Sequence, residues 1–321
     1  MLKIATLIPA IRTRFLERSL KCLSRQSYRN FDCYISDDSV DCKVIALAEA
    51  LKHENFVNFS LKTISGPRVG LAIANIRALL SEIKGEYDLV HFFLDDDIIN
   101  PDFYKAHVDL HQRIDIRVSA SARSIVNEVG RPIAMARLPE KLSGTAKKQI
   151  VVTDRYLANT MIPKINNWVG EYSNMVFKSD CQDYFGMTGW TGLHYGLADV
   201  SCPIFAGPRL GYIQEILGSF TMHKDSMTSD YENPTRKCTL LAWVQIALDA
   251  LDRGLISEES ARACINSVRV YNSKVYPSDS DMMDFQSIFD DIVSARTLDF
   301  SEFSQKWKLF IKNNFPFLDI R

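Results

Sequence analysis

The sequence lacks several features that would assign a protein to a class at once. It has no apolar run close to the roughly 20 residues that cross a bilayer, and its first apolar stretch, residues 1–9, is too short for a signal peptide. Its seven cysteines are scattered and form no CxxC pair, which argues against a disulfide framework and a thiolate zinc site. A net charge of −1 gives no general attraction for nucleic acid. We therefore expect a cytoplasmic protein with no nucleic-acid partner.

Repeats and low-complexity segments are also missing, so solenoids and linker-like chains are excluded. What remains is an ordinary globular composition, with 46% apolar and 24% charged residues. A chain of 321 residues is long enough for one large α/β domain with an added piece, or for two domains.

Short apolar runs alternate with segments of helical periodicity through the first third of the chain. This order is typical of a doubly wound, mostly parallel sheet flanked by helices. The predicted strands are 2–8, 31–36, 56–64 and 90–97, and the predicted helices are 12–27, 43–53 and 71–84.

The remaining two thirds are less regular. A strand is predicted at 119–127, a loop at 139–148 and an extended segment at 169–177. Residues 184–211 are rich in glycine and aromatic residues, and we expect them to form a packed irregular segment that lines a site. Within it, Trp190 and Tyr195 could stack on a sugar ring, or they could serve only in packing. Pro234 is the predicted boundary between a domain of residues 1–233 and a helical region of residues 234–321. The helices predicted in this region are 240–251, 258–270, 282–295 and 300–313.

Acidic residues follow two of the predicted strands. Asp37-Asp38 ends the second strand, and Asp95-Asp96-Asp97 ends the fourth. Parallel strands present their carboxyl ends at one edge of the sheet, where α/β proteins bind ligands. One set of acids could bind a nucleotide while the other holds a metal ion on its phosphates. The alternatives are an Asx turn at Asp37 and a solvated acidic loop at Asp95-Asp96-Asp97.

Short motifs occur in a fixed order along about the first 230 residues. They are a strand ending at Pro9, Gln26-Ser27-Tyr28, Asp37-Asp38-Ser39, Gly70 with Asn75, Gly85-Glu86-Tyr87, Asp95-Asp96-Asp97, Ala198-Asp199 and His223-Lys224-Asp225-Ser226. Their order and spacing resemble those of the family 2 glycosyltransferases, which have the GT-A fold.

This resemblance implies an inverting enzyme that moves a sugar from a nucleotide-diphosphate sugar, most often a UDP-sugar, to a hydroxyl group of a glycan or lipid-linked acceptor. Mn²⁺ or Mg²⁺ would neutralise the charge that develops on the departing diphosphate. The implied metal ligands are Asp97, Asp95 and His223. The implied donor-binding residues are Pro9, Asp37, Asp38, Arg68, Asp95 and Asp96, with a structural role for Asp96 and a surface role for Arg68 as alternatives.

Inversion by direct displacement needs one general base for the acceptor hydroxyl. The resemblance places Asp199 in this role, and Glu171 is the reserve candidate because Ala198 stands where an acid is usual. A second departure is Ile11-Arg12, which replaces the asparagine that commonly follows Pro9.

Other classes stay open from the sequence. A sugar nucleotidyltransferase would share the acids but needs a glycine-rich basic loop near residue 10, and a non-catalytic carbohydrate-binding or scaffold protein could keep the fold. In the C-terminal helices, aromatic residues such as Trp307 and Phe310 alternate with lysines. This pattern suits a peripheral contact at the inner face of the membrane or an oligomer contact, and packing on the protein's own domain is the alternative.

Overall fold

The computed structural model describes residues 1–54, 56–70, 72–83, 85–143, 146–181, 197–224, 234–277, 282–283, 286–290 and 299–314. The chain divides into two compact units. Unit 1 comprises Met1–Thr153, Trp168–Thr188 and Phe205–His223, and unit 2 comprises Asp154–Asn167, Gly189–Ile204 and Lys224–Arg321. The units differ from the expected boundary at Pro234, because two inner segments group with the C-terminal helices.

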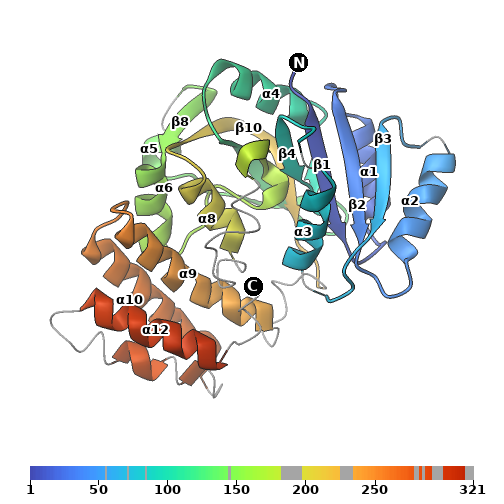
Figure 1. The fold of residues 1–321 in the computed structure, drawn as a ribbon. Helices are drawn as coiled ribbons and strands as arrows, with labels where there is room; N and C mark the ends of the chain where they lie inside the picture. Colours follow the sequence, from blue (N-terminus) through green and yellow to red (C-terminus); the bar gives the residue numbers. More distant parts are fainter. Residues whose placement is uncertain are drawn as a thin grey trace. The chain divides into compact units, whose positions relative to one another are not determined.

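Among the described residues, unit 1 is built on a sheet of ten strands in the order β3-β2-β1-β4-β9-β6-β10-β5, with β7 on β6 and β8 on β10. Its first four strands, β3, β2, β1 and β4, are labelled in Figure 1. The first four strands along this order are parallel, as are β6 and β10, while β5, β7, β8 and β9 pair antiparallel. The expected α/β class is confirmed. The strands are β1 Ile4–Ala10, β2 Phe31–Asp37, β3 Ser60–Ser65, β4 Leu89–Phe92, β5 Ile98–Ile99, β6 Val118–Val126, β7 Pro132–Met135, β8 Gln149–Thr153, β9 Met175–Lys178 and β10 Arg209–Thr221.

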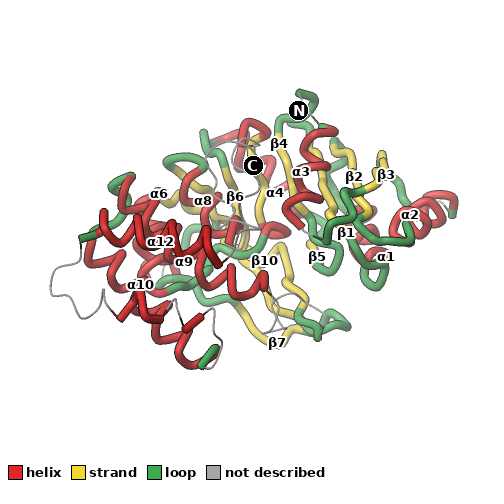
Figure 2. The backbone as a smooth tube through the Cα atoms, turned by 60° about the horizontal axis from the view of Figure 1, so that its bottom comes forward, coloured by secondary structure: helices red, strands yellow, loops and turns green. Residues whose placement is uncertain are grey.

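Helices cover the parallel half of this sheet, as the layering in Figure 2 shows. In α1, Leu16, Leu20 and Leu23 recur at helical spacing and are fully buried, so the helix turns one apolar stripe to the core. The helices and short helical turns of unit 1 are α1 Leu16–Ser24, α2 Lys43–His53, α3 Ala72–Glu82, α4 Phe103–Arg113, α5 Glu140–Ser143, η2 Tyr172–Asn174 and η3 Ser179–Cys181.

Pro9 does not end the first strand as expected. β1 continues to Ala10, and Pro9 pairs in register with Ser36 of β2. On the other side, β4 accompanies β1 only as far as Leu7. The missing N–H of Pro9 therefore costs no ladder bond to β4.

Unit 2 is helical among its described residues. The predicted helices at 240–251, 258–270 and 300–313 are confirmed, each with longer or slightly shifted bounds. The prediction for 282–295 can be compared only at 282–283 and 286–290, which are helical. The elements are α6 Asp154–Met161, η1 Ile162–Lys164, α8 Ala198–Phe205, α9 Pro234–Asp252, α10 Glu258–Val275 and α12 Phe300–Asn314.

Phe303, Trp307 and Phe310 of α12 face the interior of unit 2. Trp307 is fully buried, packs beside Phe303 and Phe310, and donates its indole N–H to Gln245 Oε1 of α9 at 3.0 Å. This face is used for packing within the unit. Phe315 and Phe317, which belong to the same sequence pattern, lie outside the described residues. None of the helices in the described ranges has the length and apolarity that a bilayer span requires.

Candidate functional site

The carboxyl ends of β1, β2 and β4 meet at a topological switch point. β1 lies between β2 and β4, and all three strands are parallel. The chain runs outward from β1 to β2 and β3 and then crosses back to β4 on the other side of β1. Such an edge leaves a crevice in which α/β proteins bind their ligands. The segments that follow these strands are 11–14, 38–41 and 93–97.

A cavity of about 500 Å³ opens at this edge beside the ends of β1 and β2. Its lining contains the cations Arg12, Arg14 and Lys43 and the acids Asp38 and Asp41. Cations next to acids suit a ligand that carries both phosphate groups and hydroxyl groups.

The three aspartates after β4 have three different environments. Asp97 is 1% exposed, and its Oδ1 accepts a hydrogen bond from the Thr221 N–H at 2.9 Å. Burial raises the pKa of Asp97 well above its usual value, and the charge of Asp96 raises it further. Contacts with the Ser173 hydroxyl and the Thr221 N–H act in the opposite direction. Asp97 is thus an acid held inside the fold.

Asp95 is partly exposed to solvent, yet densely packed. Burial raises the pKa of its carboxyl to about 8, the neighbouring Asp96 adds to the rise, and Arg12 opposes it. Arg12 also lines the cavity, so this one residue connects the cavity with Asp95-Asp96-Asp97, which we call the acidic turn.

Asp96 is joined to the distant His223. The Asp96 Oδ2 atom lies 2.9 Å from His223 Nε2, although 127 positions separate the two residues. The His223 ring packs on Phe15, the residue before α1, with 5.1 Å between the ring centroids. The structure therefore brings His223 to the acidic turn, through Asp96.

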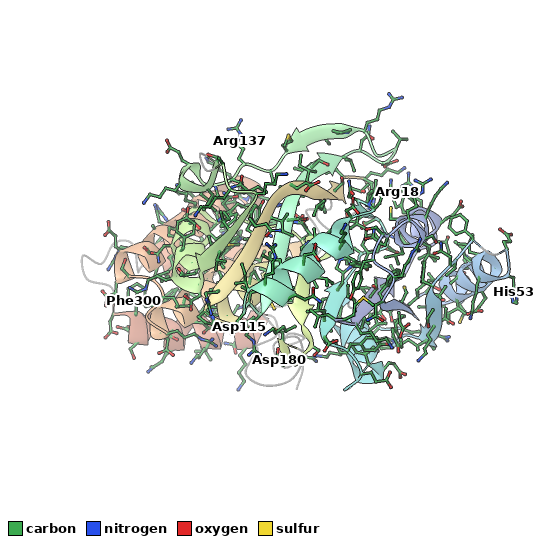
Figure 3. All side chains as sticks on the ribbon, turned by 90° about the horizontal axis from the view of Figure 1, so that it is seen from above. Arg18, His53, Asp115, Arg137, Asp180 and Phe300 are labelled. Atoms are coloured by element: carbon green, nitrogen blue, oxygen red, sulfur yellow. The ribbon has the colours of Figure 1, made fainter. Side chains whose placement is uncertain are left out.

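Arg18 of α1, labelled in Figure 3, binds three segments around this turn. Its guanidinium donates to the Asp96 carbonyl, to the Glu128 carbonyl at 2.9 Å and to the Thr221 hydroxyl at 3.0 Å, while lying over the Phe15 ring. Arg14 adds an ion pair with Glu128. The acidic turn is therefore fixed to the ends of β6 and β10.

The side chains of the two acids at the end of β2 already accept hydrogen bonds from backbone N–H groups of neighbouring segments. Asp37 accepts the N–H groups of Ser39 and Ile45 at 2.8 and 3.0 Å. Asp38 accepts those of Arg68 and Gly70 and so fixes the loop after β3. These contacts are the Asx-turn alternative at Asp37, and they leave nucleotide binding by either acid a prediction.

Arg68 contributes its backbone to this loop in a left-handed conformation with φ of 58°. Its guanidinium donates to Ser65 Oγ at 3.3 Å and to Cys42 Sγ at 2.8 Å. Phosphate binding by Arg68 stays a prediction. Pro9 lies within β1, one residue before the edge that carries the cavity.

Glu171, the reserve base, lies in an ion pair with Arg123. The Arg123 Nε atom is 2.7 Å from Oε2, and an Nη2–Oε1 hydrogen bond of 3.1 Å completes a two-point contact. Together with Asp97, Ser173 and Asn174 the pair lines a closed polar space with no room for a ligand. Both oxygens of Glu171 are therefore engaged by a cation.

Asp199 belongs to unit 2, in the first turn of α8. Its Oδ2 accepts a hydrogen bond from Asn167 Nδ2 at 2.8 Å. Its role as the base stays a prediction. Trp190, Tyr195, Asp225 and Ser226 lie outside the described residues.

Sequence reasoning missed the cations of this site. Arg12, Arg14 and Arg18 follow the first strand, whose carboxyl end is the place where a doubly wound sheet meets its ligand. Three arginines within seven positions were the available signal. Their link to Asp96 and Glu128 depends on contacts 78 and 110 or more residues apart, which no local pattern encodes.

The described residues contain no group of three His, Cys, Asp or Glu side chains arranged as a metal site. A divalent cation at the acidic turn would therefore take most of its oxygen ligands from a diphosphate and water, as Mg²⁺ commonly does. Asp97 fits such an ion, because its Oδ2 atom is buried without an aligned hydrogen bond among the described residues.

The fold of this chain, a mixed sheet flanked by helices, is shared with solved structures of TarS. The chain is similar to Staphylococcus aureus TarS, residues 1–349, in complex with UDP-GlcNAc, with a TM-score of 0.56 and 14% identity over 99% of this chain and 90% of that one. The corresponding complex with UDP gives a TM-score of 0.52 at 14% identity and the same coverage. No protein-family profile and no curated protein sequence matches the chain.

Proposed function

We propose that the protein is a metal-assisted glycosyltransferase of the family 2 type, which moves a sugar from a UDP-sugar to a hydroxyl group of a glycan or lipid-linked acceptor with inversion. The observation that carries this proposal is that Arg12 lies between the cavity at the sheet edge and the aspartates after β4. A cavity of about 500 Å³ lies at the switch point of the sheet, and Arg12 connects it to Asp95, the first of three successive aspartates. The likeness to a protein crystallised with UDP-GlcNAc and with UDP supports the same donor class.

Each group of residues has a role in this proposal. Arg12, Arg14 and Lys43 would bind the diphosphate, since guanidinium and ammonium groups donate to phosphate oxygens. Pro9, Asp37, Asp38 and Arg68 would shape the nucleotide end of the cavity.

Mn²⁺ or Mg²⁺, when bound, would neutralise the charge that develops on the leaving diphosphate. Asp95 and Asp97 would hold the ion, with His223 acting on the same turn through Asp96. Because both carboxyls have raised pKa values, they are poor places for an unpaired charge and good places for a cation.

Metal-dependent binding of UDP tests the proposal directly. Isothermal titration of UDP is expected to give binding with Mn²⁺ and much weaker binding without it. Asp95→Asn should lose the dependence on Mn²⁺, because it removes a ligand charge. Asp109→Asn, an exposed acid on α4, is the matched control and should bind as the wild type does. Binding of UDP that ignores Mn²⁺ in every variant would contradict a metal-assisted transferase.

The general base can be assigned by comparing two variants. Asp199→Asn is expected to lower kcat by at least about 10²-fold while leaving UDP binding intact, because a positioned base contributes this much. Glu171→Gln should act mainly on stability, since it leaves Arg123 without its ionic partner. Normal turnover by Asp199→Asn would remove that residue from the role.

A further inference from the structure

An exposed hairpin next to the candidate site carries apolar side chains between two arginines. It is formed by β6 and β7, and β7 runs along an outer edge of the sheet (Figure 2). Ile133 and Met135 of β7 are 55% and 63% exposed, and Val129 at the tip is 74% exposed. Ile133 and Met135 are two residues apart on a strand, so they share one face. Met222 is also 50% exposed, and its N–H donates to the Val126 carbonyl of β6 at 2.8 Å.

Beyond Glu128, which forms an ion pair with Arg14, the charge of this hairpin is positive. Between Val129 and Leu138 the charged residues of the sequence are Arg131 and Arg137, and both are exposed. Figure 3 shows the Arg137 side chain pointing away from the ribbon. Apolar side chains flanked by arginines complement a surface that offers hydrocarbon beneath a layer of negative charge.

The hairpin is held in shape before any partner binds. Asn127 Oδ1 accepts the N–H groups of Val129 and Arg131, and Gly130 turns the chain with a φ of 79°. At its base, Arg14 and Arg18 bind Glu128. Preorganised side chains lose little conformational entropy on docking, so a small apolar surface can still contribute to binding.

We propose that the β6–β7 hairpin docks this protein on an anionic lipid bilayer, with Val129, Ile133 and Met135 entering the interface and Arg131 and Arg137 binding the headgroups. The surface belongs to unit 1 and is distinct from the α12 helix, whose aromatic face is buried. The proposal does not depend on the transferase activity. Pairing of the β7 edge with a second copy of the chain is the rival use of the same strand.

Flotation with vesicles tests this docking in the full-length protein. Vesicles of phosphatidylcholine with phosphatidylglycerol are expected to carry the wild type, and vesicles of phosphatidylcholine alone should carry much less. Ile133→Ser with Met135→Ser should lower the bound fraction by roughly tenfold, because two apolar anchors are lost. Arg131→Gln with Arg137→Gln should lower binding roughly tenfold on the anionic vesicles only.

The matched control lies on α12, where Leu309 is 59% exposed beside the exposed Lys308. Leu309→Ser with Lys308→Gln should float like the wild type. Thermal unfolding checks that each variant is folded, and hydrogen exchange of residues 129–135 should slow when anionic vesicles are added to the wild type.

Three results would overturn the proposal. The first is a wild type that stays in the unbound fraction with anionic vesicles. The second is loss of flotation in the α12 variant but not in the hairpin variants. The third is a hairpin variant that changes the oligomeric state in light scattering while vesicle binding is unchanged, which would assign the β7 edge to strand pairing.

Discussion

The acidic turn shows how differently three adjacent aspartates can be used. Asp95 meets the cavity through Arg12, Asp96 binds His223, and Asp97 is held inside by the Thr221 N–H. Carboxylates that are buried without a cation reduce stability, and a site that binds a metal ion accepts this cost. Substitutions that remove the charge of these acids should therefore raise stability and weaken metal-dependent binding.

Asp97→Asn tests this separation. The amide oxygen can still accept the Thr221 N–H, and the buried carboxyl with its raised pKa is gone, so the melting temperature should rise. Manganese-dependent UDP binding should fall in the same variant. Asp97→Ala is the companion variant, and it should lower the free energy of unfolding by about 1–3 kcal/mol because the Thr221 N–H loses its partner. A less stable Asn variant would show that the carboxylate is a structural anchor.

Buried histidines predict how stability depends on pH. Burial lowers the pKa of His111 from 6.5 to about 4 and that of His91 to about 3. Between these values and 6.5 the unfolded chain binds protons that the folded chain does not, so the free energy of unfolding should fall as the pH drops below 6.5. The lost contribution of His111 alone is roughly 3 kcal/mol at pH 4.

His111→Gln should flatten this fall, because glutamine can donate to the Val176 carbonyl without titrating. His53→Asn, at an exposed position on α2, should leave the slope unchanged. Denaturant unfolding at several pH values measures both slopes. Equal slopes for His111→Gln and the wild type would rule out this histidine as the source.

At the scale of elements, sequence periodicity located the strands and helices of the parallel half of the sheet well. Their apolar runs are uninterrupted and their breaks coincide with glycine, proline or acids, as at Asp37 and Gly85. The helix α4 was missed because its buried face carries His107 and His111, which hydrogen bond to Ser119 inside the core. Polar residues that are satisfied by tertiary contacts remove the apolar stripe on which the prediction depends.

The strand β10 was missed for another reason. Gly211 and Gly218 weaken a strand pattern, yet each is required by a close neighbour. A Cβ atom at Gly211 would lie 2.6 Å from Ile116 Cδ1, and one at Gly218 would lie 2.7 Å from Asn174 Oδ1. The helix α6 and the strand β8 were also absent from the prediction, which read 139–148 as a loop and left the following residues unassigned.

The helix α12 offers a test of packing within unit 2. Trp307→Ala should lower the free energy of unfolding of this unit by about 3–5 kcal/mol, because it empties a buried site and leaves Gln245 Oε1 without its donor. Leu309→Ala, on the exposed side of the same helix, should change it by less than about 0.5 kcal/mol. Circular dichroism during thermal unfolding distinguishes the two. A mild effect of Trp307→Ala would mean that α12 contributes little to the unit.

At the scale of the whole molecule, the two compact units should respond differently to the donor. The cavity and the acidic turn belong to unit 1. UDP with Mn²⁺ should therefore raise the transition temperature of unit 1 in calorimetry. The free energy of unfolding of unit 1 should rise by about 2.7 kcal/mol at a ligand concentration of a hundred times Kd. UDP without metal and Mn²⁺ alone are the controls. An unchanged thermogram with both ligands present would count against a donor site in unit 1.

The guanidinium of Arg18 has a consequence for communication inside unit 1. It joins the backbone of the acidic turn, the base of the β6–β7 hairpin and the end of β10, so none of these three can shift without straining the others. Energetic coupling of this kind works in both directions. Binding of a lipid surface at the hairpin would therefore change the affinity for a nucleotide at the aspartates, and nucleotide binding would change the affinity for lipid by the same factor. Arg18 is the residue that connects the two sites.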